Sequence, residues 1–532
     1  MKKRAVCLLL AVLLIFALGG CAQKDKGVDP SKIDAKLVEE LSKKWKIGDD
    51  IRFDWYIGLS WWQYNKKWTE YPVLNEITQI TGVTPTAIIP TGEGTEKLNL
   101  MMSTNSLPDL ITISPDDSSI IDKLITQDYV YSYDELIEKF APEFKDEIDP
   151  AVWDTSSYDD GKLYSLPCFF SKDKEKVGAQ TFNVRQDIYE ELGSPDMSTV
   201  DGFIGALKAF KEKYPTIEGK ASIPLTIGTG FYRFMLEESF GIQTYYTDGS
   251  GNVKIRFKNP KYPEFAKFMN RLYNEKLLDP ETFIKMEGGL NEDLAAGRVF
   301  CYPSTYWGLD AANATLNKNK PGSGFIAIEP LKNAENVSFP GTNSRGWMTT
   351  FISKKAKNPE AIIKFIRFMW SKEGNLLTNY GHEGKEYTIE GDTIVRSPDV
   401  VKQMANDPDG FASDTGIFTF RLFQFPYYND APSNDPTVKS NDEIAQKYGR
   451  DNTVFSYKMA PDAATREGMM ASKVWAVYER EWPKMVMAKN ETEAIAKLNE
   501  MLAAMETQGL SQVEKYWTDR YNQNVEKFGP MN

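Results

Sequence analysis

Residues 98–113 read LNLMMSTNSLPDLITI, and this stretch places a helix directly before a short buried strand. Leu98, Met101 and Met102 recur at helical spacing, whereas Asp109–Ile113 is a continuous apolar run that favours a strand. The small polar residues and the proline between the two segments mark a turn. The stretch therefore predicts a helix, a turn and a strand in succession.

The chain before this unit shows the same alternation. Residues 51–57 (IRFDWYI) and 83–89 have the composition of strands, and residues 71–82 and 93–104 have helical patterns. The resulting β-α-β-α-β order predicts a parallel sheet with helices on both faces. Further helices are predicted at Arg185–Leu192, Val200–Lys213, Tyr262–Leu277, Pro359–Trp370 and Glu491–Gln508.

Length and charge limit the classes of function. With 532 residues, the chain is too long for one small domain and fits three domains or two large lobes. Its 63 Lys and Arg residues against 75 Asp and Glu residues give a net charge of −12, which argues against a nucleic-acid partner and makes an anionic polymer a poor default ligand. No cofactor is predicted.

The only histidine, His382, excludes a His-rich metal site and the HExxH zinc motif, and allows a Ser-His-Asp triad only around this one ring. It lies in a Gly-His-Glu-Gly turn and is interpreted as structural or exposed rather than catalytic. The Asp/Gly-rich turns at 248–251 and 407–410 do not have the spacing of a twelve-residue calcium loop, so plain turns are favoured.

The N-terminus has the pattern of an export signal. A basic start is followed by an apolar run, residues 5–18, that is shorter than the ~20 residues of a membrane-spanning helix. The run ends in Leu18-Gly19-Gly20-Cys21, which resembles the bacterial lipobox, so residues 1–20 are predicted to be removed and Cys21 to carry lipid, with palmitate-like acyl chains. Removal takes three basic residues, giving −12 − 3 = −15. Residues 21–44 are then expected to form the tether.

The two cysteines that remain, Cys168 and Cys301, leave two alternatives open, which are one disulfide or two buried thiols.

Several motifs, taken in order along the chain, resemble the family 1 extracellular solute-binding proteins, the receptors of ABC importers. Behind the lipobox these motifs span about residue 45 to near the C-terminus, and the subgroup they are most similar to is associated with oligosaccharide uptake. The segments that carry the resemblance are 98–109, 160–167 (DGKLYSLP), 183–187 (NVRQD), 192–193, 294–299 (LAAGRV), 357–361 (KNPEA) and 381–387 (GHEGKEY).

The resemblance implies an α/β, two-lobed periplasmic-binding-protein-like fold of type II, in which each lobe is a mostly parallel sheet flanked by helices. It places one hinge crossing near 166–170 and another near 345–350. The first lobe would then comprise 45–166 plus 346–400, and the second 167–345 plus 401–532.

Ligand contacts are expected in loops after strands, because ligands of open α/β sheets bind beyond the carboxyl ends of the strands. After the first strand, Trp61 or Trp62 offers an indole face to a sugar ring, although one of the two is expected in the core. After the third strand, Asp116 is a candidate acceptor for sugar hydroxyls, and Asp117 is the better candidate for a helix cap.

Three further aromatic residues are candidates. Trp307 follows a strand in a segment that resembles a sugar-stacking position of the family, with packing against the next helix as the alternative. Tyr232 lies where a predicted strand gives way to a helix, and Trp347 lies at the second expected crossing.

The function implied is that of a lipid-anchored receptor, on the outer face of the membrane, that captures an oligosaccharide and delivers it to the transmembrane permease subunits of an ABC importer. A binder of peptides or other non-sugar solutes on the same fold remains an alternative. A surface glycoside hydrolase or lyase is the other, because a pair of acidic residues can also flank a scissile glycosidic bond.

Overall fold

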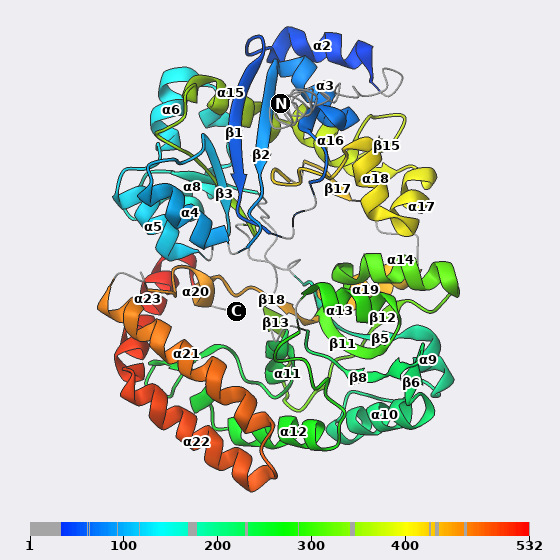
Figure 1. The fold of residues 1–532 in the computed structure, drawn as a ribbon. Coiled ribbons are helices and arrows are strands. Elements are labelled where there is room, and N and C mark those ends of the chain that lie inside the picture. The colour runs from blue at the N-terminus through cyan, green and yellow to red at the C-terminus, as the bar shows by residue number, and fades with distance from the viewer. Residues whose placement is uncertain are drawn as a thin grey trace, which may run out of the picture.

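Strand β1 (Ile51–Ile57) is the second strand from one edge of the first sheet in the computed structural model (Figure 1). It pairs in parallel with β2 (Val83–Ile88) on one side and β3 (Leu110–Ile113) on the other. Strand β14 (Thr349–Ile352) runs antiparallel to β3, and β4 (Ser165–Pro167) antiparallel to β14, which gives the order β2-β1-β3-β14-β4. The β-α-β-α-β prediction for residues 51–113 is therefore confirmed.

The structure describes residues 33–530 except 61, 63, 93, 116, 169–177, 229–231, 286, 341–345, 425–426, 431–435 and 462–464. The predicted signal segment, Cys21, Trp61 and Asp116 lie outside the described residues.

The Leu-Pro-Asp segment before β3 has a clear structural role. The Asp109 carboxylate is buried, and it accepts hydrogen bonds from the backbone N–H groups of Asp54 and Lys357, each at 2.9 Å. Asp109 thus ties β1 and the loop before α15 (Pro359–Trp370) to the start of β3. Helix α4 (Gly94–Ser103) packs Leu98 and Met102 against this part of the sheet, as their spacing predicted.

The second sheet has the order β12-β5-β11-β8. Strand β5 (Gln180–Arg185) runs antiparallel to both β11 (Val299–Thr305) and β12 (Phe325–Ile328), and β8 (Ile223–Leu225) is parallel to β11. The expected mostly parallel sheet is thus realised in β2-β1-β3, whereas both sheets as a whole are mixed. Strands β5 and β14 are the first strands after the chain has passed from one lobe to the other, and each runs antiparallel to its neighbours.

Helices cover both sheets, and Figure 1 shows them divided between an upper and a lower lobe. Those of the first lobe, besides α4 and α15, are α2 (Ala35–Trp45), α3 (Pro72–Thr81), α5 (Ser118–Thr126), α6 (Tyr133–Phe140), α7 (Phe144–Glu147), α8 (Pro150–Ser156), α16 (Lys372–Tyr380), α17 (Pro398–Asn406) and α18 (Pro408–Thr415). Those of the second lobe are α9 (Gln186–Glu191), α10 (Val200–Lys213), α11 (Arg233–Ser239), α12 (Tyr262–Asn274), α13 (Glu287–Ala295), α14 (Asp310–Asn319), α19 (Pro436–Tyr448), α20 (Thr453–Ser456), α21 (Arg466–Val486), α22 (Glu491–Thr507) and α23 (Leu510–Phe528).

Short strands form additional sheets of two or three strands in the lobes. They are β15 (Tyr387–Glu390), β16 (Thr393–Arg396) and β17 (Asn429–Asp430) in the first lobe, and β6 (Thr216–Ile217) with β7 (Lys220–Ala221), β9 (Tyr245–Thr247) with β10 (Val253–Ile255), and β13 (Phe339–Pro340) with β18 (Gly449–Arg450) in the second.

The chain passes between the lobes at three places. The first crossing lies between Cys168, which belongs to the core of the first lobe, and β5, which begins the second lobe. The second crossing lies between β13, which is in the second lobe, and Met348, which packs in the first. The expected crossings near 166–170 and 345–350 overlap these places only in part, because β4, Cys168 and β14 still belong to the first lobe. The third crossing lies between β17, which pairs with β16, and α19, which packs on β5 and β12.

Two of the expected domain boundaries differ from the packing. The hydrophobic side chains of Phe411, Phe420 and Phe423 lie in the same core cluster as Trp55 of β1, so residues beyond 400 continue the first lobe up to the third crossing. At the other end, α2 is a helix packed on α3, and Trp45 contacts Phe368 with ring centroids 5.5 Å apart. Residues 35–44 therefore belong to the first lobe rather than to a free tether.

Cys168 and Cys301 are both buried free thiols, so the disulfide alternative is not realised. In the part of the chain that the structure describes, no helix combines the length and the apolar character that crossing a membrane requires. The turn at 248–251 is a plain turn, in which Asp248 accepts hydrogen bonds from the backbone N–H groups of Ser250 and Asn252. The plain turn expected at 407–410 is wrong, because Pro408 begins helix α18 and Asp407 is its N-cap, accepting a hydrogen bond from the Gly410 N–H.

Candidate ligand site between the lobes

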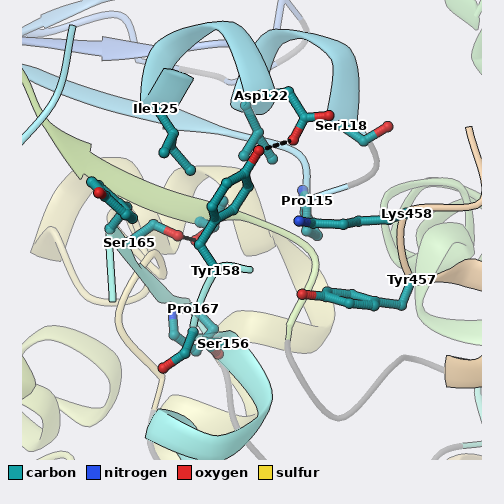
Figure 2. Close-up of a pocket in the computed structure, with 14 residues that line it drawn as sticks. Pro115, Ser118, Asp122, Ile125, Ser156, Tyr158, Ser165, Pro167, Tyr457 and Lys458 are labelled. Atoms are coloured by element: carbon teal, nitrogen blue, oxygen red, sulfur yellow. Dashed lines mark hydrogen bonds between the residues drawn. The ribbon is translucent and has the colours of Figure 1, made fainter. Parts of the chain in front are cut away.

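One pocket is built from residues of both lobes (Figure 2). It lies beyond the carboxyl ends of β3 and β4, where α/β folds place ligand sites. Its volume is about 60 Å³, far below the about 300–1,000 Å³ typical of pockets that enclose a small-molecule ligand. The lining residues used below are Ser118, Asp122, Ser157 and Tyr158 from the first lobe and Tyr457 and Lys458 from the second.

Lys458 fastens the lobes together in this pocket, and Figure 2 shows its side chain extending toward Tyr158. The Lys458 Nζ lies 3.7 Å from the centre of the Tyr158 ring and 3.1 Å from Asp159 Oδ1. The Tyr158 hydroxyl donates a 2.6 Å hydrogen bond to Asp122 Oδ1. Burial lowers the pKa of Lys458 despite the neighbouring Asp159 carboxylate, and burial together with the Asp122 hydrogen bond raises the pKa of Tyr158.

Two further hydrogen bonds cross between the lobes beside Lys458. The Ser118 hydroxyl donates to the Ala460 carbonyl at 3.1 Å, and Lys527 Nζ donates to the Ser157 carbonyl at 3.2 Å. Because the cavity is small and the polar groups around it already bond one another, we assign it to holding the lobes in register. This set of interactions is called the Lys458 contact below.

A second group of residues, in the first lobe, is aromatic and cationic. Trp62 and Trp347 stack with ring centroids 5.9 Å apart and an angle of 27° between the ring planes. Trp62 is 7% exposed, whereas Trp347 is only partly buried. The guanidinium carbon of Arg421 lies 5.6 Å from the centre of the Trp62 ring and 4.9 Å from that of Phe418.

The second lobe contributes aromatic residues around the carboxyl end of β11. The Tyr232 hydroxyl is 3.5 Å from Thr305 Oγ1, and its ring lies edge-on to Tyr302. Trp307, two residues after Thr305, is 44% exposed and contacts Tyr306 with ring centroids 5.1 Å apart. The structure thus places two predicted residues, Tyr232 and Trp307, around the same strand end.

Asp310 connects these two groups electrostatically. It is the first residue of α14, which contacts α17 and α18 of the first lobe, and Figure 1 shows α14 directly below α17. The Asp310 side chain stays exposed to solvent, although protein from both lobes surrounds it. Desolvation raises the pKa of Asp310 to about 6, against the opposing attraction of the Arg421 guanidinium in the other lobe.

The predicted site residues fall into three sets. Trp62 with Trp347, and Tyr232 with Trp307, form one group in each lobe, while Trp61 and Asp116 lie outside the described residues. One of the two neighbouring tryptophans, Trp61 and Trp62, was expected in the core, and Trp62 is a core residue. Their roles as ligand contacts stay predictions. Asp117 occupies the N-cap position of α5, but its side chain makes no capping hydrogen bond, so that part of the expectation is wrong.

His382 has a structural environment, as interpreted. It is 7% exposed, with Nε2 2.8 Å from Glu76 Oε2 and Nδ1 2.8 Å from Glu386 Oε2. Among the described residues, no group of three or more potential metal ligands is present.

Sequence reasoning missed Arg421, Asp310 and Lys458. A weak signal existed for Arg421, which stands in the run Phe418-Thr419-Phe420-Arg421-Leu422-Phe423, a single cation among aromatic residues. Nothing in the sequence indicated that Lys458 would face Tyr158.

Comparisons with known proteins identify a family of solute-binding proteins. The sequence pattern of the family described as "Bacterial extracellular solute-binding protein" matches residues 64–376, more than half of the chain. Lipoprotein LipO of Bacillus subtilis is 22% identical over 354 residues, covering 64% of this chain and 68% of the relative. The fructooligosaccharide ABC transporter substrate-binding protein FusA of Streptococcus pneumoniae is 26% identical over 310 residues, covering 55% of this chain and 56% of FusA.

The crystal structure of the alginate-binding protein AlgQ2 without calcium ion has the same fold. It superposes with a TM-score of 0.67 at 21% sequence identity and covers 90% of this chain and 99% of that one. The two-lobed architecture expected from the sequence is therefore confirmed.

Proposed function

The chain belongs to the bacterial extracellular solute-binding proteins, and we propose that its solute is a carbohydrate, specifically an oligosaccharide, held between the two lobes. As a member of this family it is a binding protein and not an enzyme, so the hydrolase and lyase alternative is set aside.

The observation that carries the proposal is the supply of aromatic rings from both lobes. Trp62 and Trp347 stack in the first lobe, and Tyr232 and the 44% exposed Trp307 flank one strand end in the second. An indole offers a sugar ring a large, rigid apolar face with little side-chain entropy to lose. Rings from opposite lobes suit a ligand of more than one sugar unit.

Related proteins support a carbohydrate rather than a peptide. FusA is named for a fructooligosaccharide and AlgQ2 for alginate, and both are similar to this chain over half of its length or more.

We place the receptor on the outer face of the cell membrane. The extracellular family and the similarity to a lipoprotein support lipid attachment at Cys21, after removal of residues 1–20. From there the ligand-bound form would deliver its cargo to the transmembrane permease subunits of an ABC importer. Closure of the lobes around the ligand is a population shift, driven by the preference of the ligand for the closed arrangement.

The ligand is tested by a thermal-shift screen followed by calorimetry. The protein is the mature chain with Cys21→Ser, which keeps every described residue, and the panel contains plant and microbial oligosaccharides, with monosaccharides and peptides as controls. A ligand at a hundred times its Kd adds about 2.7 kcal/mol to the free energy of unfolding. Stabilisation by one related set of oligosaccharides supports the proposal, and stabilisation by peptides alone would contradict it.

The anchor is tested in cells. We expect an alkyne analogue of palmitate to label the full-length protein and the protein to sediment with membranes, and Cys21→Ser to abolish both. Labelling that persists in the Cys21→Ser variant would contradict the anchor without touching the sugar proposal.

A further inference from the structure

Arg421 is a cation that lies against the aromatic group of the first lobe. It follows α18 in a turn of the first lobe, and its guanidinium lies against the faces of Phe418 and Trp62. Trp62 in turn stacks on Trp347. A planar guanidinium therefore lies beside a stacked tryptophan pair at the boundary with the second lobe.

The Arg421 guanidinium has no hydrogen-bond acceptor among the residues that the structure describes. Among the described residues, none lies within hydrogen-bond or ion-pair distance of it, although the side chain is half-buried and burial lowers its pKa. Two acids, Asp409 in its own lobe and Asp310 across the boundary, attract it from beyond that distance. No unpartnered nitrogen of Arg421 is fully buried, so its N–H donors stay open to solvent and are available to an acceptor that comes from outside the protein.

Three other enclosed arginines among the described residues are each paired with a carboxylate. Arg256 bonds Glu237, Arg450 bonds Glu238 and Arg185 bonds Asp187, each within an ion pair. Arg421 departs from this pattern, and it does so beside Trp62, one of the predicted ligand contacts. The acceptor that would complete its surroundings is therefore expected to come with the ligand.

We propose that Arg421 binds the carboxylate of a uronic acid unit, so that the ligand is an acidic oligosaccharide. This inference rests on the proposed function and deepens it. A carboxylate accepts two parallel hydrogen bonds from a guanidinium, and the adjoining pyranose ring can stack on the neighbouring Trp347. Asp409 and Asp310 balance part of the charge of Arg421, which favours a singly charged carboxylate over a phosphate.

The net charge of the protein does not oppose this contact. The excess of 75 acidic over 63 basic residues acts at long range, and salt screens it beyond about 8 Å under physiological conditions. The guanidinium acts at contact distance and decides the interaction there.

Asp310 defines the rival interpretation. If Arg421 instead serves as a latch that pairs with Asp310 when the lobes close, both residues would support the binding of any ligand. In the uronate arrangement, the Asp310 carboxylate faces the ligand carboxylate, so its removal leaves affinity unchanged or improves it. Arg421→Gln and Asp310→Asn thus have opposite expected effects.

The test measures Kd by calorimetry on the mature Cys21→Ser chain with trigalacturonate and trimannuronate, and with neutral galactotriose and mannotriose as matched probes. We expect an acidic trisaccharide to bind the wild-type protein, and Arg421→Gln to weaken that binding at least 30-fold. Arg421→Lys should have an intermediate affinity, because lysine keeps the positive charge but cannot donate two parallel hydrogen bonds to one carboxylate. Asp310→Asn should leave this affinity unchanged or raise it. Each variant's melting temperature verifies folding.

Three results would overturn the inference. They are an unchanged affinity in Arg421→Gln, an equal loss in Asp310→Asn, and binding of neutral oligosaccharides with rejection of both uronates. The last result would leave the proposed function intact. Failure of every carbohydrate in both panels to bind would overturn the function as well.

Discussion

Replacing His382 by glutamine is expected to destabilise the first lobe at pH 6 and to have almost no effect at pH 9.5. The ring bridges Glu76, whose side chain is fully buried, and Glu386. Glu76 also accepts the backbone N–H of Asp34 at 2.6 Å, so the bridge ties the start of α2 to α3. Burial alone would lower the pKa of His382, but the hydrogen bonds and charges of Glu386 and Glu76 outweigh it and raise the pKa from 6.5 to about 9.

The size and the sign of the effect follow from that pKa. A difference of about 2.5 between the folded and unfolded pKa corresponds to about 3 kcal/mol at 1.36 kcal/mol for each pKa unit. Because the folded pKa is the higher one, this stability is fully present below pH 6.5 and is lost as the pH rises through 9. About 1 kcal/mol should remain at pH 8, and almost none at pH 9.5.

The assay is differential scanning calorimetry of the wild-type and His382→Gln proteins at constant ionic strength. For a lobe of this size, 3 kcal/mol corresponds to about 6–12 °C in the first-lobe transition at pH 6. The chain has one histidine, and other groups that titrate in this range, such as Glu238 with its pKa raised to about 7, cancel in the difference between the two proteins.

Lys385→Gln is the matched control, because Lys385 pairs with Glu386 from the solvent side and is 67% exposed. It should cost less than about 1 kcal/mol at either pH. A destabilisation by His382→Gln that is the same at pH 6 and pH 9.5 would refute a charged imidazolium between the two carboxylates.

Three further predictions concern the boundary between the lobes. Trp307→Ala should weaken oligosaccharide binding at least tenfold in calorimetry with an unchanged melting temperature, because the side chain is 44% exposed; unchanged affinity would exclude Trp307 as a contact. Trp62→Ala should lower both affinity and melting temperature, because Trp62 is 7% exposed and supports Trp347; a variant of wild-type stability would contradict that packing. Lys458→Met removes a cation–π contact worth up to about 2 kcal/mol. Small-angle scattering should therefore show a more open molecule, and every ligand should bind about tenfold more weakly. A weaker affinity for one ligand alone would contradict a role of Lys458 in holding the lobes together.

Helix positions were predictable where local capping sets the ends. The predicted helices at Val200–Lys213 and Pro359–Trp370 coincide with α10 and α15. In both, the residue before the helix caps it, since the Thr199 and Asn358 side chains accept hydrogen bonds from backbone N–H groups in the first turn. Such signals lie within a few residues of one another and can be read from one sequence.

Features that depend on distant packing were not predictable. The run from Phe418 to Phe423 looks apolar and buried, but only the folded chain shows that Phe420 and Phe423 pack on Trp55 of β1. The sequence also could not indicate that β5 would run antiparallel to both of its neighbours, because strand direction depends on where the chain crosses between the lobes.

The candidate site shows the same division. The aromatic residues were found because indole and phenol rings after strands have a recognisable chemistry, and the structure brings them together in pairs within each lobe. Arg421 and Lys458 were not predicted as site residues, because arginine and lysine are common in any sequence and only their neighbours in the folded chain distinguish these two. For Arg421 the unusual feature is the lack of an acceptor among the described residues, and for Lys458 it is the Tyr158 ring from the other lobe.

The two ends of the lobe boundary contribute differently to ligand recognition. At the Lys458 contact the cross-lobe bonds are already formed, so weakening them lowers the fraction of molecules ready to bind and reduces every affinity by one common factor. The Arg421 guanidinium has no acceptor among the described residues, so replacing Arg421 should change the affinity only for ligands that supply an acceptor. The ratio of two affinities therefore cancels the effect of Lys458 and isolates that of Arg421, which makes the ratio, rather than any single Kd, the measure of specificity.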